Sequence, residues 1–261
     1  MELEILGSGT SFGVPEIGCD CEVCESPDPR DQRYRCSVWL RHEELSLVVD
    51  APPEFRLQCR RAGLTRLDAM LITHLHADHI FGLDDLRKFN RLQEAEMPVY
   101  LPETMEERFR QLFHYTLESA HSGLTRPRFD LRAIGLDAFT LGEVRIQPLD
   151  MEHSHERIYG YLFQVNDFRI AYMTDCKSLS AESEALVRGA DVAIIGALWK
   201  ADWTHAGHLN LQEAIAYSQK LGIQRTLLTH ITHKMGLHAA TSTELPTGIE
   251  LAYDGLVIRD S

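Results

Sequence analysis

The sequence predicts an α/β fold in which strands and helices alternate and pack in layers. Three observations lead to this prediction. Short apolar runs typical of buried strands recur along the chain, helical patterns lie between some of them, and no repeat or long linker interrupts the sequence. The 261 residues, 44% hydrophobic and 25% charged, suffice for one large domain or two small ones, and we predict one domain over 1–261.

The expected elements follow one another from the N-terminus. Strands are expected at 2–7, 45–50, 69–74, 99–101, 144–150, 159–165, 168–175, 191–198, 225–230 and 251–258. Helices are expected at 82–95, 103–118, 180–189 and 210–221, and Asn210 has the side chain of an N-cap for the last helix. The segment 103–135 carries helix signals and then "SGLTRPRFD", which is less regular. We interpret it as an insertion or lid and not as a second domain.

Charge and hydropathy limit the partners of the chain. A net charge of −13 argues against a broad basic surface for RNA or DNA, although a local basic patch stays open. No apolar run reaches the roughly 20 residues that cross a bilayer, and "MELEILGSGT" has acidic residues where a secretory signal is basic. We therefore predict a cytoplasmic protein without nucleic-acid or membrane partners; a homodimer stays open.

A crowded stretch of histidines follows the strand expected at 69–74. "LITHLHADHIFGL" places His74, His76, Asp78 and His79 within six residues. Histidines two apart on extended backbone share a face, which suits one metal ion, and the next two residues can face a second ion nearby. A surface loop that happens to be rich in histidine is the alternative.

Three further residues lie where later expected strands end. His153 follows 144–150, and Asp175 and His230 end 168–175 and 225–230. Loops at strand ends converge on one edge of a sheet, so these side chains can complete a dinuclear site. We assign His74, His76 and His153 to one ion and Asp78, His79 and His230 to the other, with Asp175 bridging. Asp50, which ends "LSLVVD", is expected to orient a ligand histidine.

The stretch "GCDCEVCES" holds Cys19, Cys21 and Cys24 in a C-x-C-x-x-C spacing. Three close thiols need a fourth ligand to make a tetrahedral structural zinc site, and His233 in "THITHKMG" is the candidate. Three reduced cysteines in a loop are the alternative. Cys36 and Cys59 are expected to be ordinary buried thiols, and the role of Cys176 stays open.

The chain resembles the metallo-β-lactamase superfamily. "THLHADH" carries the signature of that superfamily, and His153, Asp175 and His230 match its later ligand motifs in order. The resemblance covers nearly the whole chain and implies an αββα sandwich with the metals at one edge of the two sheets. It does not fix the reaction, because members include lactamases, thioester hydrolases, nucleases, phosphodiesterases and oxidoreductases.

A narrower resemblance concerns the PhnP-type phosphodiesterases of the carbon–phosphorus lyase pathway. It rests on the cysteine cluster after "GSGTSFGVPEIG", on "HITH" followed by "AYDGL", and on "GHLNLQEA". It implies a structural zinc held by Cys19, Cys21, Cys24 and His233, active-site zinc or manganese, and hydrolysis of small cyclic phosphodiesters.

Phosphodiester cleavage needs help for a poor alkoxide leaving group. His208 can protonate that oxygen or hold a non-bridging oxygen, although it can also simply help to start the helix, and His205 is a rival for the role. We assign catalytic roles to His208 and Asp78. His155 could replace His153 as a ligand, and Trp199 and Trp203 either line a pocket or have a core or surface role.

We therefore predict a metal-dependent phosphodiesterase with two divalent ions, zinc or manganese, and one structural zinc. A hydroxide bridging the two ions would attack phosphorus in line. The alternatives are an RNA 3′-end-processing nuclease of the same fold, a thioester or lactam hydrolase, and a non-catalytic biosynthetic accessory protein.

Overall fold

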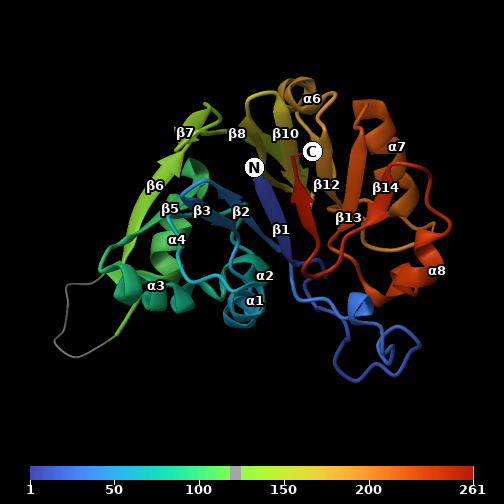
Figure 1. Cartoon of the computed structure of the whole chain (residues 1–261), viewed down its shortest axis with the longest axis horizontal. Coiled ribbons are helices and arrows are strands. Elements are labelled where there is room, and N and C mark those ends of the chain that lie inside the picture. The colour runs from blue at the N-terminus through green and yellow to red at the C-terminus, as the bar shows by residue number, and fades with distance from the viewer. Residues whose placement is uncertain (118–124, 201, 261) are drawn as a thin grey trace.

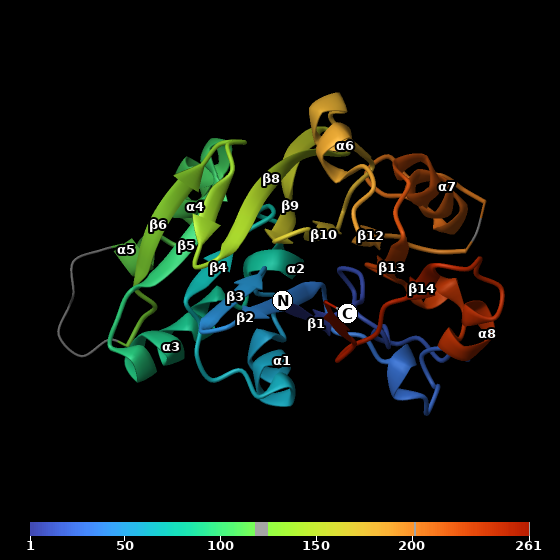
Figure 2. The same ribbon diagram turned by 45° about the horizontal axis from the view of Figure 1, so that its top comes forward.

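Two β-sheets packed face to face form the centre of the protein, in a computed structural model that describes residues 1–117, 125–200 and 202–260. Helices lie on the outer side of each sheet (Figure 1). In the second view, α1 and α3 lie on the side of the first sheet, and α6 and α7 lie beside the second (Figure 2). The layered α/β fold, with two sheets between helices, is therefore confirmed.

The first sheet has seven strands and is formed mainly by the N-terminal half. Its strands, in spatial order, are β15 (Val257–Arg259), β1 (Glu2–Gly7), β2 (Ser37–His42), β3 (Leu45–Val49), β4 (Ala69–Leu71), β5 (Met97–Pro102) and β6 (Phe129–Ile134). The pairs from β15 to β3 are antiparallel, and the pairs from β3 to β6 are parallel. Parallel strands bring their carboxyl ends to one edge, where polar loops can meet.

The second sheet has eight strands and is formed by the C-terminal half. Its order is β11 (Ser178–Leu179), β8 (Val144–His153), β9 (Glu156–Val165), β10 (Phe168–Met173), β12 (Val192–Gly196), β13 (Arg225–Thr229) and β14 (Ile249–Leu251), and β7 (Phe139–Leu141) pairs with β8. The strands from β10 to β14 are parallel. They also direct their carboxyl ends to one edge.

Three hydrophobic clusters hold the layers together. One fills the space between the sheets, with Leu3 and Ile5 against Tyr161 and Phe163. The second joins the outer face of the first sheet to α1 (Phe55–Ala62), α3 (Leu86–Gln93) and α4 (Glu106–Leu112). The third joins the second sheet to α6 (Ala181–Val187) and α7 (Leu211–Leu221). Burial of these apolar faces drives the stacking of the layers.

Short helical elements complete the fold. They are α2 (Ala77–Ile80), α5 (His114–Leu117), α8 (His238–Ser242) and the 3₁₀ turns η1 (Pro29–Asp31), η2 (Leu83–Asp85), η3 (Glu103–Met105) and η4 (His233–Met235). Over the residues that the structure describes, no helix has the length and apolar character to cross a membrane.

Most expected elements are confirmed, and the differences have local causes. The expected strand at 251–258 is two strands, because the chain turns at Gly255, whose φ is +95°. The helix expected at 82–95 begins as η2 and becomes regular only in α3. Strand β2 and helix α1 are not among the expected elements, because both are short; β2 ends in the partly buried Arg41 and His42, and α1 carries the exposed Arg56, Arg60 and Arg61.

The predicted N-cap of α7 is confirmed. The Asn210 side chain accepts from the Glu213 backbone N–H, and the Glu213 side chain accepts from the Asn210 backbone N–H, so the two form a capping box. The segment 103–135 contributes η3, α4, α5 and then β6, which pairs with β5. Its residues 118–124 lie outside the described part of the chain, and its role as an insertion or lid stays a prediction.

Candidate metal centre

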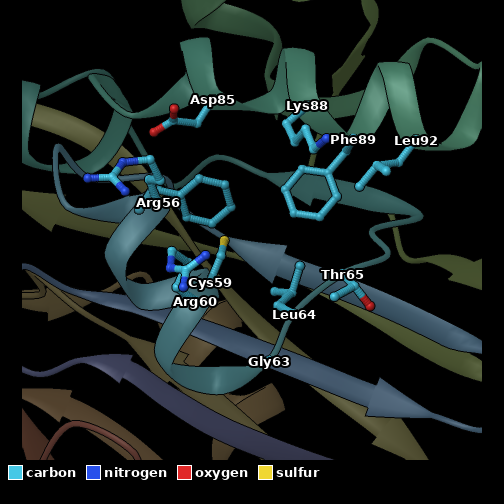
Figure 3. Close-up of a pocket in the computed structure, with 11 residues that line it drawn as sticks. Arg56, Cys59, Arg60, Gly63, Leu64, Thr65, Asp85, Lys88, Phe89 and Leu92 are labelled. Carbon is cyan, nitrogen blue, oxygen red and sulfur yellow. The ribbon is translucent and has the colours of Figure 1, made fainter.

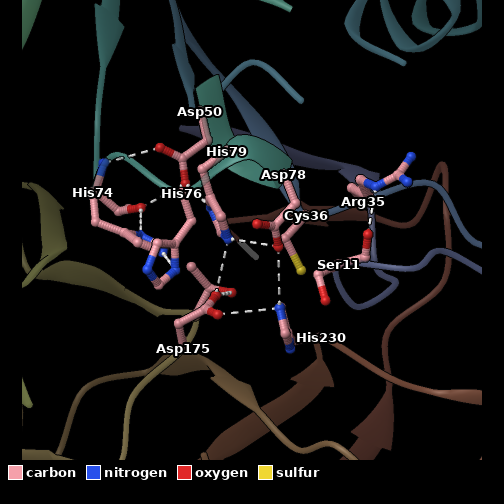
Figure 4. Close-up of polar contacts among 12 residues, drawn as sticks. Ser11, Arg35, Cys36, Asp50, His74, His76, Asp78, His79, Asp175 and His230 are labelled. Atoms are coloured by element: carbon pink, nitrogen blue, oxygen red, sulfur yellow. Dashed lines mark hydrogen bonds and ion pairs between the residues drawn. The ribbon is translucent and has the colours of Figure 1, made fainter. Parts of the chain in front are cut away.

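The carboxyl ends of strands from both sheets meet at one edge, where the seven side chains assigned to the dinuclear site converge, with His208 beside them. Figure 4 shows His74, His76, Asp78, His79, Asp175 and His230 of this cluster. Strand β3 ends beside Asp50, and the loop after β4 carries the histidine-rich stretch. Strand β8 ends on His153, and Asp175 and His230 follow β10 and β13 closely. The residues that the sequence assigns to a dinuclear site are thus neighbours in space.

The first set of three donors is His74, His76 and His153, whose ligand atoms all lie within 4.8 Å of one another. His74 Nε2 lies 2.9 Å from His76 Nδ1. The His74 Nδ1–H donates to the Thr73 hydroxyl over 3.0 Å, because that hydroxyl donates in turn to Asp50. His74 therefore directs the lone pair of Nε2 into the cluster.

The second set of three donors is Asp78, His79 and His230, whose ligand atoms also lie within 4.8 Å of one another. His79 Nε2 lies 3.4 Å from Asp78 Oδ2, and His230 Nε2 lies 3.8 Å from the same oxygen. Both imidazoles are almost fully buried, so their nitrogens face the cluster and not solvent.

Asp175 lies between the two sets. Its Oδ2 is 3.2 Å from His79 Nε2 and its Oδ1 is 3.1 Å from His230 Nε2. Its carboxylate also groups with His74 and His79 within 4.8 Å. A carboxylate with contacts to both sets has the position that a bridging ligand requires.

Hydrogen bonds outside the cluster fix the orientation of its rings. Asp50 Oδ2 accepts from His79 Nδ1 over 2.7 Å, and the Gly207 carbonyl accepts from His153 Nδ1 over 3.0 Å. When such a ring is neutral, the bond keeps its proton on Nδ1 and leaves Nε2 free to act as a ligand. The predicted orienting role of Asp50 agrees with this geometry.

Several buried imidazole nitrogens of the cluster have no hydrogen-bond partner among the described residues, and this fits a site for metal ions. His79 Nε2, both nitrogens of His230 and His208 Nδ1 are buried and have no hydrogen-bond partner among the described residues. Such groups cost free energy unless a further partner satisfies them. Imidazole nitrogens and carboxylate oxygens suit zinc and manganese, so the donor set is chemically appropriate for two divalent ions.

The electrostatics keep the aspartates ionised. Burial opposes this, yet His79 and His230 lower the pKa of Asp78 below its usual value, and His230 and His79 do the same for Asp175. Burial lowers the pKa of His74 and of His76, so these rings stay neutral. Carboxylate and neutral imidazole are the forms that bind metal. Burial opposes the charged form of His79, but Asp175, Asp50 and Asp78 outweigh it and raise the pKa of this ring, so a bound ion would have to displace a proton from His79.

His208 lies beside this cluster, just before α7. Its ring stacks on His230 at 4.8 Å, and its Nδ1 lies 3.7 Å from Asp175 Oδ1. Burial lowers its pKa to about 3, so the ring is neutral in the absence of an anion. The rival His205 is exposed, with its ring 5.0 Å from that of His208. His155 is also exposed, in the turn between β8 and β9.

The cysteine cluster forms a separate donor set. His233 Nδ1 lies 3.2 Å from Cys19 Sγ, 3.4 Å from Cys21 Sγ and 3.6 Å from Cys24 Sγ. The backbone N–H of Cys24 lowers the pKa of Cys21 to about 7, which favours a thiolate. Three thiols and one imidazole around a common point fit a tetrahedral zinc ion.

The remaining three cysteines belong to neither proposed metal site. Cys36, Cys59 and Cys176 are buried, and burial raises the pKa of Cys36 and of Cys59 to about 12. Burial also raises the pKa of Cys176 above its usual value. These thiols stay protonated at neutral pH, as expected for structural cysteines.

A cavity of about 290 Å³ lies beside His76 and is lined by Leu75, Thr104, Met105, Arg108, Glu156 and Arg157. Glu156 joins it to the cluster, since it lies 3.7 Å from His76 Nε2 and 3.7 Å from Arg108. A larger cavity of about 460 Å³ lies between α1 and α3 and includes none of the donors (Figure 3). The smaller cavity is therefore the relevant one for a reaction at the cluster.

Sequence reasoning did not find Arg108, Glu156 or the Gly207 carbonyl. Arg108 belongs to the segment interpreted as a lid, and Glu156 starts a strand with no special motif. The carbonyl of Gly207 has no side-chain signal at all. The only hint was its place one residue before His208.

Comparisons with known proteins agree with this geometry. The family model described as "Beta-lactamase superfamily domain" matches residues 46–231. A crystal structure of a new diphosphatase from the PhnP family is 37% identical, with a TM-score of 0.88 over 98% of this chain and 96% of that chain. An octanoyltransferase of Porphyromonas gingivalis is 33% identical over 98% of this chain, which spans about half (51%) of that relative's length.

More distant matches show the fold in other settings. Zn(2+)-bound PqqB from Methylobacterium extorquens is 19% identical, with a TM-score of 0.80 over 99% of this chain and 100% of that chain. Ribonuclease Z of Thermococcus kodakarensis is 24% identical over 151 residues, which cover 56% of this chain and 46% of that protein.

Proposed function

The chain belongs to the beta-lactamase superfamily and is of the PhnP type, and on this basis we propose that it is a metal-dependent phosphodiesterase that hydrolyses a small, cyclic phosphodiester. One observation carries the proposal. Two sets of donors, buried except for the partly exposed His76 and Asp78, meet at Asp175. Nitrogens of His79 and His230 in the second set have no hydrogen-bond partner among the described residues.

The residues have separate tasks in this proposal. His74, His76 and His153 would hold one ion, Asp78, His79 and His230 the other, and Asp175 would contact both. When bound, two divalent ions supply positive charge for the phosphoryl oxygens and an activated water near neutral pH. Asp50, Thr73 and the Gly207 carbonyl keep the ligand rings in one orientation.

His208 acts on the substrate and not primarily on the ions. As a neutral ring it has one N–H to donate to a non-bridging oxygen. A phosphodiester anion beside it stabilises the charged ring, which can then protonate the leaving oxygen. Asp78, ionised and next to His230, combines the role of ligand with that of a fixed negative charge near the reacting atoms.

The size and charge of the surroundings support a small substrate. The adjoining cavity of about 290 Å³ has Arg108 and Arg157 in its wall, and although these contact Glu156 and Asp150, their remaining N–H groups can bind a small anion. A nuclease would need a broad basic surface, whereas the chain has a net charge of −13. A non-catalytic accessory protein would have no need for seven convergent donors.

The experiment combines metal analysis with hydrolysis of bis-p-nitrophenyl phosphate and of a five-membered cyclic diester. Protein loaded with zinc or manganese should turn over both substrates, and His76→Ala should lose at least about 100-fold in kcat/KM because it loses a metal ligand. His155→Ala is the matched control, since that histidine is exposed and two residues from a ligand. Near-normal turnover by metal-replete His76→Ala would contradict the dinuclear assignment, and faster cleavage of a tRNA precursor would favour the nuclease.

A further inference from the structure

Lys177 lies two residues after Asp175 and contacts the chain at His208. Its Nζ donates to the His208 carbonyl over 3.2 Å and to both carboxylate oxygens of Glu213 over 3.1 Å each. An ammonium group has three N–H donors, so these three acceptors match them in number. Lys177 thereby joins the segment that carries Asp175 to the segment that carries His208.

The ring of His208 depends on its backbone for its position. Its Nδ1 is buried, has no hydrogen-bond partner among the described residues, and lies 3.7 Å from Asp175 Oδ1, beyond hydrogen-bond distance. The ring packs instead against the rings of His230 at 4.8 Å and His153 at 4.7 Å. Such packing directs a ring nitrogen less strictly than a hydrogen bond does, so the place of this ring follows from the place of its backbone.

The backbone on either side of His208 is fixed by other contacts. The Gly207 carbonyl accepts from an imidazole N–H over 3.0 Å, and the Leu209 carbonyl accepts from the Leu198 N–H over 2.9 Å. The carbonyl of His208 itself accepts from Lys177. Loss of the lysine would release the peptide group next to the ring while the neighbouring peptide groups stay in place.

Lys177 is itself fixed at both ends. Its backbone N–H donates over 2.8 Å to the carbonyl of Glu152, near the end of β8. Glu213, which binds the ammonium group, belongs to the capping box of α7, where its side chain accepts from the Asn210 N–H over 2.9 Å. Lys177 is also partly buried, so salt screens its contacts less than those of a fully exposed pair.

These contacts make Lys177 a link between a metal donor and the residue that acts on the leaving group. We propose that Lys177 is a positioning residue, which fixes the His208 ring relative to Asp175 and therefore relative to the leaving oxygen. A displacement of about 1 Å can cost a reaction about 100-fold in rate, so this role has a measurable effect. The proposal rests on the proposed phosphodiesterase activity. The alternative is an ion pair that only stabilises the start of α7.

The kinetic test is a double-mutant cycle of Lys177→Met and His208→Ala, with both proteins loaded with metal. We expect Lys177→Met to lose roughly 10- to 100-fold in kcat on the five-membered cyclic diester, whose leaving group is an alkoxide, with little change in KM. In the His208→Ala background the same substitution should cause no further loss, because it acts through a ring that is no longer there. Lys220→Met is the matched control, since Lys220 binds Glu184 at the other end of α7, and it should turn over like the wild type.

Two kinetic outcomes would overturn the proposal. One is Lys177→Met with the kcat of the wild-type protein. The other is an equal loss with and without His208, which indicates a general structural effect. Glu213→Gln is a second variant in case Lys177→Met does not fold, because glutamine can still accept from the Asn210 N–H but lacks the charge that binds the ammonium group. Its loss in kcat should also disappear in the His208→Ala background, and a loss that persists there would overturn the proposal as well.

A structural measurement separates this proposal from the phosphodiesterase activity. In crystals of Lys177→Met the His208 ring should be displaced from Asp175 or lose its order, and in crystals of Lys220→Met it should keep its place. A displaced ring, together with a wild-type protein that hydrolyses no diester, would support the positioning role and contradict the phosphodiesterase. An unmoved ring in Lys177→Met would contradict the positioning role and leave the phosphodiesterase intact wherever the wild-type protein hydrolyses a diester.

Discussion

Three residues of the metal centre have backbone conformations that are unusual for their type. Asp50, Asp175 and His230 have φ values of 62°, 55° and 55°, in the left-handed region that L-residues rarely occupy. Such conformations cost about 1–3 kcal/mol each, so the surrounding structure must compensate for them. Each of these residues lies at the end of a strand and has its side chain in the cluster. A change to an ordinary negative φ would redirect the backbone and move that side chain away from the cluster.

The position of His208 beside the metal donors fits two roles, protonation of the leaving oxygen and binding of a non-bridging oxygen, and kinetic measurements distinguish them. If His208 protonates the leaving oxygen, His208→Ala should retain the active-site metals and lose roughly 10²–10⁴-fold in kcat on alkyl diesters. The loss should be smaller for p-nitrophenyl diesters, because p-nitrophenolate leaves without a proton. The measurement is kcat for both substrate types, with metal content determined for each protein.

His205→Ala is the control for this prediction, because His205 is exposed and only its ring is near His208. Equal losses for alkyl and aryl diesters in His208→Ala would assign His208 to oxyanion binding. Leaving-group dependence in His205→Ala would assign the proton transfer to that residue.

His238 is a buried histidine that belongs to none of the donor sets described above, and it predicts a pH dependence of stability. Its Nδ1 lies 3.2 Å from Arg33 Nη2, and a guanidinium can only donate, so the ring must accept and stay neutral. Burial, followed by the charges of Arg33 and Arg30, lowers its pKa to about 4, whereas Asp31 and Asp28 act in the opposite direction. The unfolded chain therefore takes up the proton first as the pH falls.

The sign of the effect follows from this difference in pKa. The free energy of unfolding should fall between pH 6.5 and 4, by up to about 3 kcal/mol from this group alone. His238→Gln can still accept from Arg33 but does not titrate, so it should lose that part of the pH dependence. Denaturant unfolding of both proteins at pH 7.5, 6 and 4.5 measures it; parallel curves would contradict the prediction.

At the scale of elements, the N-terminal loop is attached to the segment that follows β13. The Ile231 N–H donates to the Ser8 carbonyl over 3.0 Å, and the Thr10 N–H donates to the Ile231 carbonyl over 3.2 Å. This pairing carries the loop with Cys19, Cys21 and Cys24 to η4, where His233 lies. A zinc ion there would join the N-terminal loop to the segment after β13. Because that segment also carries His230, the zinc would support the position of an active-site donor.

Cys21→Ser should therefore act on stability before it acts on catalysis. We expect the loss of one zinc per chain and a lower melting temperature, by about 2–4 °C for each kcal/mol lost, with activity falling as a consequence. Cys59→Ala is the matched control, because Cys59 is a buried cysteine outside both donor sets. Equal zinc content in Cys21→Ser and wild type would rule out the Cys₃His site.

For the whole molecule, the fold and the metal centre depend on different residues. Three hydrophobic clusters hold the layers together, whereas the active-site donors lie at the edge where strands end. Removal of the active-site ions should therefore abolish activity and lower the melting temperature but leave the sheets intact.

Chelation followed by far-ultraviolet circular dichroism and thermal unfolding tests this separation. The spectrum should persist, cooperative unfolding should remain, and added zinc should restore both activity and melting temperature. Manganese should restore only what the active-site ions contribute, because the cysteine donors favour zinc. Loss of cooperative unfolding after chelation would show instead that the ions are needed to fold the sandwich.

The sequence alone determined the local parts of this protein. Strand β1 and helix α7 follow from apolar patterning and a capping residue, and the spacing of His74, His76, Asp78 and His79 predicts a metal site before any fold is known. The reason is physical: side-chain periodicity, capping and close ligand spacing depend on residues within one or two turns of the chain.

Only the tertiary structure decided which distant residues meet. The motifs suggest His233 as a partner of Cys19, but only the pairing with the segment after β13 brings the two together across 214 residues, and only the approach of the Gly207 carbonyl fixes the ring of His153. It also buries His208 and leaves His205 exposed, although both precede the same helix. Contacts of this kind depend on how two sheets stack and on backbone carbonyls that have no side-chain signal, so no local pattern in the sequence encodes them.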